Sequence, residues 1–169
     1  MREQTTAGSA DPNSVRKVVS VEAPPAIAWQ VFTERMGEWW PLAMYKIGKA
    51  NAVDAVIEPR VGGRWYERGD DSSTCDWGRV LAWEPPSRLV LSWDITADWQ
   101  YDPALHTEIE VRFISEGKAG TRVEFEHRRL DRYGTRRDEM RKVFDETGDW
   151  GRLLASFAQI AAASAGSRG

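Results

Sequence analysis

The sequence has few of the residues that build disulfides, metal centres and hydrolytic triads. Its 169 residues include one cysteine, Cys75, which excludes an intramolecular disulfide and a cysteine-cluster metal site. The two histidines, His106 and His127, leave few arrangements for a Ser-His-Asp triad. We therefore predict a protein of the reducing cytoplasm that carries neither a metal nor another cofactor.

Long apolar runs and an excess of one charge are also missing. No run approaches the roughly 20 apolar residues of a membrane-spanning helix, and residues 1–14 lack the apolar centre of a signal peptide. The net charge is −3, with 23 basic and 26 acidic residues almost in balance, so no overall field attracts nucleic acid. Five carboxylates at 131, 138, 139, 145 and 146 are mixed with the arginine-rich stretch 128–142, which is typical of a solvated surface. We predict no membrane insertion and no nucleic-acid partner.

Tryptophan, by contrast, is abundant, with nine copies in the chain. Its side chain is wide and rigid and carries one polar edge. These rings serve either as bulky filler of an ordinary core or as the walls of a shaped cavity. Composition alone leaves both interpretations open.

Hydrophobic periodicity divides the chain into strands and helices. Apolar and β-branched patterns predict strands at residues 15–21, 52–58, 64–68, 74–83, 88–95, 107–115 and 121–129. A helical period predicts short helices at 26–34 and 36–40 and a long helix at 136–163. Gly148 predicts a break in that helix, and Gly78 predicts a bulge in its strand. We expect a disordered tail at 1–13, one domain at 14–164 and a second tail at 165–169.

Alternation in the last two strands assigns the faces of the predicted sheet. One face carries Thr107, Ile109, Val111, Phe113, Val123, Phe125 and His127. The other carries glutamates and arginines, for which cross-strand ion pairs are a simpler explanation than a catalytic carboxylate pair. A dry sheet face and a long apolar helix must bury each other. This predicts an α+β fold with a curved antiparallel sheet around the C-terminal helix, and a cavity in the gap between them.

Several segments resemble one protein family. Residues 62–66 (GGRWY) and 78–93 (GRVLAWEPPSRLVLSW) are similar to consecutive motifs of the activator of Hsp-ninety ATPase homologue family, in the START-like SRPBCC superfamily. Residues 26–40, 120–127 and 148–157 resemble its helical start, its penultimate segment and its Gly-Trp helix signature, here with one extra residue inserted. The resemblance covers residues 15–163 and implies the helix-grip fold with a deep hydrophobic cavity. It implies no single function, because members include lipid carriers, polyketide cyclases and chaperone cofactors.

The candidate ligand-binding residues are the aromatic and apolar side chains expected around this cavity. They are Trp39, Trp40, Trp65, Tyr66, Trp77, Trp93, Phe113, Phe125, His127, Trp150, Leu154 and Phe157. Because Trp65 and Tyr66 are adjacent in a strand, which of them faces the cavity stays open. His127 either binds a polar group of the ligand, acts as an acid or base, or is a hydrogen-bonded core histidine. No catalytic residue is assigned.

Three functions are compatible with these features. The preferred interpretation is binding of a small hydrophobic ligand that is lipid-like, aromatic or polyketide-like. One alternative is a chaperone-cofactor-like interaction module with a protein partner in the stress response. The other is a cyclase- or dehydratase-type enzyme that uses His127, Tyr66 or Arg64 in the same cavity. Binding without catalysis is favoured over an enzyme, and the sequence leaves a homodimer open.

Overall fold

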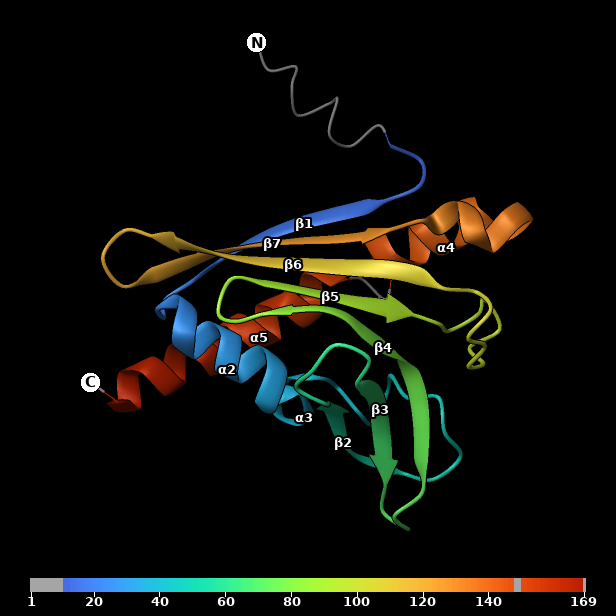
Figure 1. Cartoon of the computed structure of the whole chain (residues 1–169), viewed down its shortest axis with the longest axis horizontal. Coiled ribbons are helices and arrows are strands. Elements are labelled where there is room, and N and C mark those ends of the chain that lie inside the picture. The colour runs from blue at the N-terminus through green and yellow to red at the C-terminus, as the bar shows by residue number, and fades with distance from the viewer. Residues whose placement is uncertain (1–10, 148–149, 169) are drawn as a thin grey trace.

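The structure, a computed structural model, describes residues 11–147 and 150–168. In these ranges the chain forms a first strand, two short helices, six further strands and a segmented C-terminal helical region (Figure 1). The strands are β1 (Val15–Val21), β2 (Ala52–Ile57), β3 (Arg64–Gly69), β4 (Thr74–Glu84), β5 (Arg88–Trp93), β6 (Thr107–Glu116) and β7 (Gly120–Arg128). The helical segments are α2 (Pro25–Glu34), α3 (Met36–Trp39), the 3-10 helix η1 (Leu130–Arg136), α4 (Arg137–Lys142), the π-helix η2 (Val143–Thr147) and α5 (Trp150–Arg168).

All strands of the described chain join one antiparallel sheet in the order β1-β7-β6-β5-β4-β3-β2. Strands β2 to β7 follow one another as a meander, and β1 extends the sheet by pairing with β7, with Val19 opposite Val123. The sheet curves over α5, which also contacts α2 and α3 (Figure 1). The predicted α+β helix-grip fold is confirmed, with the short helices directly after the first strand.

The concave side of the sheet forms the core together with α5. Ile109 and Val111 of β6 are at most 1% exposed, as the alternation predicts. Leu154 and Phe157 of α5 meet them from the other side and are equally buried. Each such side chain adds about 1.5–3 kcal/mol of hydrophobic stabilisation, so this layer holds the helix on the sheet.

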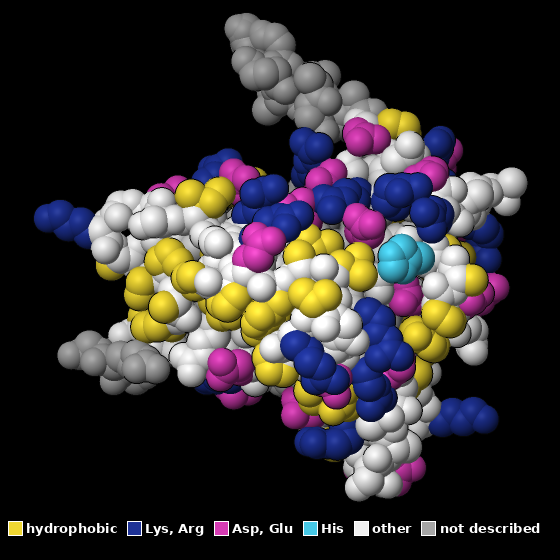
Figure 2. All heavy atoms as spheres, viewed as in Figure 1, with side chains coloured by type: hydrophobic (Ala, Val, Ile, Leu, Met, Phe, Trp, Pro, Cys, Tyr) yellow, Lys and Arg dark blue, Asp and Glu magenta, His cyan; other side chains and the backbone are white. Residues whose placement is uncertain are grey.

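The outer side of β6 and β7 carries charged side chains, and basic and acidic groups are mixed over this region (Figure 2). Glu110 lies at the centre of an ion-pair network. Its carboxylate pairs with Arg88 at 2.7 Å, with Arg112 at 2.8 Å, and with Arg128. The cross-strand ion pairs predicted for this face are confirmed, and they account for its closely spaced carboxylates.

A bulge interrupts the pairing of β3 with β4, as Gly78 predicts. Trp65 lies opposite Gly78, whereas the next residue, Tyr66, lies opposite Asp76, so one residue of β4 is left over. A Cβ atom on Gly78 would lie 1.9 Å from the carbonyl oxygen of Ser92, so only glycine permits this approach of β4 to β5. The extra residue is Trp77, whose side chain the bulge turns into the concave side.

The C-terminal region differs from the single predicted helix at 136–163. Helical structure begins earlier, at Leu130, and changes type twice before α5 starts. One cause is Gly134, whose φ of 59° and ψ of −126° interrupt the first segment. At the other end α5 continues to Arg168, through residues expected to form a tail. The break predicted at Gly148 and the first ten residues of the tail predicted at 1–13 lie outside the described residues. Residues 11–13 are ordered instead, because the Leu130 N–H donates to the carbonyl of Asn13 at 3.0 Å.

Candidate functional site: a tryptophan-lined pocket

An apolar pocket of about 400 Å³ opens beside the start of α5. It lies between strands β4 and β5, the π-helix η2 and the loop that follows α3. Its lining residues are Trp40, Met44, Tyr45, Lys46, Ile47, Trp77, Trp93, Ile95, Trp99, Val143, Phe144, Trp150 and Leu153. The volume lies in the range of small-molecule sites, about 300–1,000 Å³.

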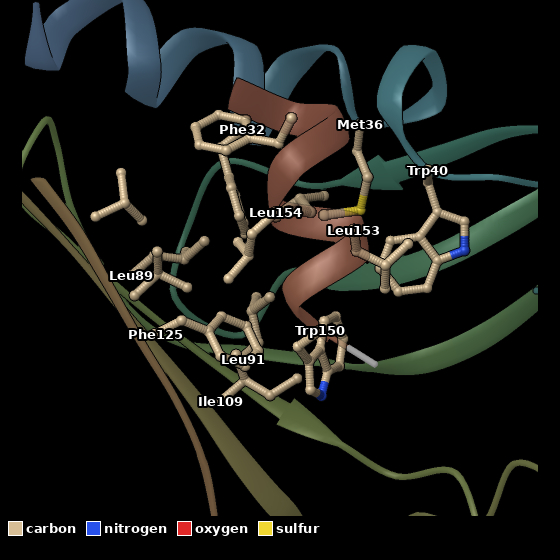
Figure 3. Packing of buried hydrophobic residues seen from close by; sticks show 14 of the residues in the cluster. Phe32, Met36, Trp40, Leu89, Leu91, Ile109, Phe125, Trp150, Leu153 and Leu154 are labelled. Atoms are coloured by element: carbon tan, nitrogen blue, oxygen red, sulfur yellow. The ribbon is translucent and has the colours of Figure 1, made fainter. Parts of the chain in front are cut away.

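Four of the predicted site residues line this pocket: Trp40, Trp77, Trp93 and Trp150. Their rings form one cluster, with centroids 4.9 Å apart for Trp40 and Trp77, 5.6 Å for Trp40 and Trp150, and 5.3 Å for Trp93 and Trp150. Figure 3 shows Trp40 and Trp150 at one end of the core, close to Leu153. The aromatic wall is therefore continuous from α3 to α5.

The other predicted site residues do not line the pocket. Those buried in the core are Trp39, Trp65, Phe113, Phe125, His127, Leu154 and Phe157. Tyr66 is on the opposite side of β3 from the buried Trp65, and the guanidinium of Arg64 lies 4.2 Å from the centre of its ring. Trp65, and not Tyr66, is thus the ring that points inward.

Much of the pocket wall comes from residues that periodicity does not reveal. Met44, Tyr45, Lys46 and Ile47 belong to the loop after α3, and Trp99 belongs to the loop between β5 and β6. Loops carry no repeating pattern from which a facing direction can be read. The one available signal is Trp99 itself, because a large ring within a polar loop is unusual and here remains 43% exposed at the pocket.

Four of the five tryptophans that line the pocket donate their indole N–H to a protein acceptor. The Nε1 atom of Trp40 donates to the carbonyl of Tyr45 at 2.8 Å, and that of Trp77 donates to the Glu67 carboxylate at 2.9 Å. Trp93 donates to the Tyr133 hydroxyl at 3.1 Å. A buried indole N–H without an acceptor would cost about 1–3 kcal/mol of folding stability. These bonds therefore fix the ring orientations.

Trp150 is anchored by a chain of buried groups centred on His127. The Trp150 Nε1–H donates to His127 Nδ1 at 3.3 Å, which makes Nδ1 the unprotonated nitrogen. His127 Nε2–H then donates to the Thr107 hydroxyl at 2.9 Å, and that hydroxyl donates to the Trp93 carbonyl at 2.8 Å. Complete burial lowers the pKa of His127 to about 3. His127 is therefore a neutral core histidine that orients a pocket ring.

Glu67 performs a similar role for the pocket loop. Its buried carboxylate accepts hydrogen bonds from the backbone N–H groups of Ile47 at 2.6 Å and Gly48 at 2.9 Å, besides the indole of Trp77. Three N–H donors satisfy a charge that would otherwise be costly to bury. One side chain of β3 thus holds both a wall ring and the loop that borders it.

Tyr133 links the C-terminal region to the same wall. Its hydroxyl accepts from Trp93 and donates to the Ile95 carbonyl at 2.7 Å. Burial raises the pKa of Tyr133, so the hydroxyl keeps its proton for that bond. The position of Trp93 is therefore fixed by a residue 40 positions further along the chain.

A second titratable cluster lies near the end of β5 and does not line the pocket. Asp94 is 2% exposed, and its Oδ2 atom accepts a hydrogen bond from the Ser92 hydroxyl at 3.1 Å. Its Oδ1 atom has no hydrogen-bond partner among the described residues, and His106 Nδ1 lies 3.7 Å away. Burial raises the pKa of Asp94 to about 6. In the described part of the chain, no group of three or more His, Cys, Asp or Glu side chains is placed to hold a metal ion.

No helix in the described ranges is both long and apolar enough to cross a lipid bilayer. The curved sheet, the gripped helix and the aromatic pocket define a helix-grip α+β domain. The sequence matches the profile of the family described as activator of Hsp90 ATPase homolog 1-like protein over residues 22–162, and the chain belongs to this family. The resemblance carried by residues 62–66 and 78–93 is thereby confirmed. No curated protein sequence matches the chain.

Solved structures share this architecture. The anthrahydroquino-γ-pyrone synthase Txn09 is 37% identical, with 89% of this chain and 99% of that chain covered and a TM-score of 0.62. CalC from Micromonospora echinospora, a self-sacrificing resistance protein, is 29% identical, with 90% and 96% covered and a TM-score of 0.67. NE0264 from Nitrosomonas europaea is 16% identical, with 90% and 96% covered and a TM-score of 0.64, and this similarity concerns the fold alone.

Proposed function

We propose that the chain binds a small apolar ligand with a flat aromatic ring system in the tryptophan-lined pocket. The observation that carries this proposal is the direction of the indole N–H groups. Four of the five tryptophans that line the pocket, Trp40, Trp77, Trp93 and Trp150, turn their donors toward protein partners, so these four present the carbon faces of their rings to the pocket. Such faces favour offset or edge contacts with another aromatic ring and offer little to a strongly polar molecule.

The comparisons support an aromatic ligand. Txn09 is described as a synthase of an anthrahydroquino-γ-pyrone, a polycyclic aromatic compound, and is 37% identical to this chain over nearly its whole length. A pocket with walls of aromatic rings suits a ligand of that general shape. Lipid-like ligands are less well matched, because a flexible chain gains nothing from ring-to-ring geometry.

Binding is favoured over catalysis by the residues that face the pocket. Its titratable lining groups among the described residues are Tyr45 and Lys46. His127 is neutral and has both ring nitrogens engaged, and Arg64 and Tyr66 lie on the other side of β3. A cyclase or dehydratase would need a positioned acid or base at the ligand. The chaperone-cofactor alternative rests on the family description and on the apolar Met44 and Trp99 exposed at the pocket.

Calorimetric titration with N-phenylnaphthylamine, a neutral aromatic probe, tests the proposal. We expect binding of one molecule per chain. The substitution Ile47→Trp replaces an aliphatic side chain of the pocket wall with a bulky indole ring, which fills the pocket and should abolish binding of the probe. The matched control is Val61→Trp, which adds the same ring at a side chain that is 65% exposed outside the pocket.

Two results would overturn the proposal. One is the absence of heat of binding with the unmodified chain. The other is equal binding by the Ile47→Trp and Val61→Trp variants, because the probe would then occupy a different surface. Thermal unfolding of both variants checks that neither loss reflects misfolding.

A further inference from the structure

Lys46 is the one charged side chain among the described residues that line the pocket. Its ammonium donates to the carbonyl oxygen of Gly48 at 2.6 Å, which is an uncharged acceptor. No carboxylate of the described chain lies within ion-pair distance of it, although most arginines on this molecule's surface have such a partner. Within residues 11–147 and 150–168, the pocket therefore has a cation at its border without a carboxylate to pair with it.

Glu67 is the buried carboxylate nearest to this loop along the hydrogen-bond network, and both of its oxygens already accept hydrogen bonds from neutral N–H groups. Its two oxygens accept from Ile47 N, Gly48 N and Trp77 Nε1. It forms no ion pair with Lys46 in the described structure, and it does not line the pocket. Glu67 thus places the loop without neutralising the ammonium that the loop presents.

The loop around Lys46 is held in place before any ligand arrives. Tyr45 is tied by its carbonyl to the indole of Trp40, and the two residues after Lys46 are tied by their backbone N–H groups to Glu67. A cation on a fixed loop costs little to organise when an anion binds. Aromatic walls also exclude water, which strengthens an electrostatic contact at their edge.

We propose that the ligand carries an anionic group, such as a carboxylate, a sulfonate or an acidic phenolate, beside its aromatic rings, and that Lys46 is its counter-ion. This inference rests on the proposed function of the same pocket and adds the charge of the ligand to it. The ligand rings lie in the pocket against Trp40, Trp77 and Trp150, and the anion lies at the loop. The single cation then selects, among flat aromatic compounds, those that are acidic at neutral pH.

Two probes with one skeleton test the inference. Anilinonaphthalene sulfonate and N-phenylnaphthylamine differ by a sulfonate group. We expect the sulfonate to bind the unmodified chain about tenfold more tightly, as is typical of a charge-assisted contact. Lys46→Met should reduce its affinity to that of the neutral probe and change neutral-probe binding less than twofold.

Controls separate the charge from the fold. Lys49→Met removes a neighbouring exposed lysine that does not line the pocket and should leave both affinities unchanged. Lys46→Arg should retain the preference for the sulfonate, because it keeps the charge. Raising the salt concentration should weaken binding of the sulfonate and not of the neutral probe.

The outcomes distinguish the two proposals. If the neutral probe binds but the sulfonate gains nothing, or if Lys46→Met leaves the gain intact, the counter-ion role is wrong and the aromatic pocket stands. If neither probe binds, the proposed function is wrong as well. If the sulfonate binds equally well to Ile47→Trp, it occupies another site and the inference is overturned.

Discussion

The two ends of the space between sheet and helix are both lined with aromatic side chains. One end is filled by these side chains, and the other contains the pocket. At the filled end, Phe32 makes edge contacts with Phe113 at 5.7 Å and with Phe157 at 5.2 Å, and all three rings are at most 4% exposed. At the hollow end, Trp93 and Trp150 are 5.3 Å apart, yet a pocket remains beside them.

The polar edge of the ring limits how the tryptophans beside the pocket can move. A phenyl ring has no donor and can turn until it fills the available space. An indole whose N–H is bonded to His127 or Glu67 cannot turn inward without leaving a buried donor and acceptor unsatisfied. Abundant aromatic residues do not by themselves make a cavity. Anchoring does not make one either, because the anchored indole of Trp39 packs against Phe32 and Phe157 at the filled end.

Two adjacent leucines of α5 provide the largest test of this comparison. Leu154 is 2% exposed in the filled core, whereas Leu153 is 4% exposed and borders the pocket. Leu154→Ala should lower the free energy of unfolding by about 3–5 kcal/mol, because the new cavity is closed on all sides. Leu153→Ala should cost about 2 kcal/mol, because part of its surroundings is already open.

Urea unfolding of the two variants under identical conditions measures the difference. Unchanged m-values would show that each variant still unfolds as the parent does. A cost for Leu153→Ala equal to or above that of Leu154→Ala would contradict the distinction between filled and hollow ends.

The neutral histidine at the boundary gives a pH test. The pKa of His127 is about 3 in the folded chain and about 6.5 when unfolded, so the unfolded state takes up the proton as pH falls. Between pH 6.5 and 3, this one group should remove about 1.4 kcal/mol of stability per pH unit, and above pH 6.5 it should have no effect.

His127→Gln isolates that contribution, because a glutamine amide can still accept from Trp150 and donate to Thr107. As the pH falls below 6.5, the unfolding free energy of the unmodified chain should decrease steadily relative to that of the variant. A constant difference from pH 8 to pH 4 would mean that the folded ring takes up its proton over the same pH range as the unfolded chain, and is therefore protonated at pH 4. In that case it could not accept the bond from Trp150.

Asp94 should change stability with pH in the opposite direction to His127, and by a smaller amount. Its folded pKa of about 6 is above its usual value, so its stabilising contribution is complete below about pH 4 and is lost as pH rises through 6. Asp94→Asn should raise the unfolding free energy by about 1–2 kcal/mol at pH 7.5 and leave it unchanged at pH 4. Denaturant unfolding at both values measures this. A less stable variant at pH 7.5 would show that His106 holds the ionised form instead.

The strands were predictable because their side chains alternate. The structure begins and ends β1 at the predicted residues, and it buries Val123 and Phe125 on the predicted face. Alternation fixes relative faces only, which is why the choice between Trp65 and Tyr66 needed the structure. The inward phase of His127 was visible, but its bond to Trp150 was not, because that contact joins two distant parts of the chain.

The pocket was the least predictable part. Four of its residues belong to aromatic positions that strand and helix patterns expose, but its border belongs to two loops. The position of the first loop depends on Glu67, a charged residue within the predicted strand 64–68. A sequence pattern cannot state that a carboxylate will be buried and bonded by three N–H donors.

The meander also has a consequence for how the chain assembles. From β2 to β7 every strand pairs with its neighbour in sequence, so these contacts close short loops. Pairing of β1 with β7 joins Val19 to Val123 and must close most of the chain at once. We expect the hairpins that carry Trp65, Trp77 and Trp93 to form early and the filled end to be completed last. The strands that carry the tryptophan wall of the pocket would then form before the rest of the core.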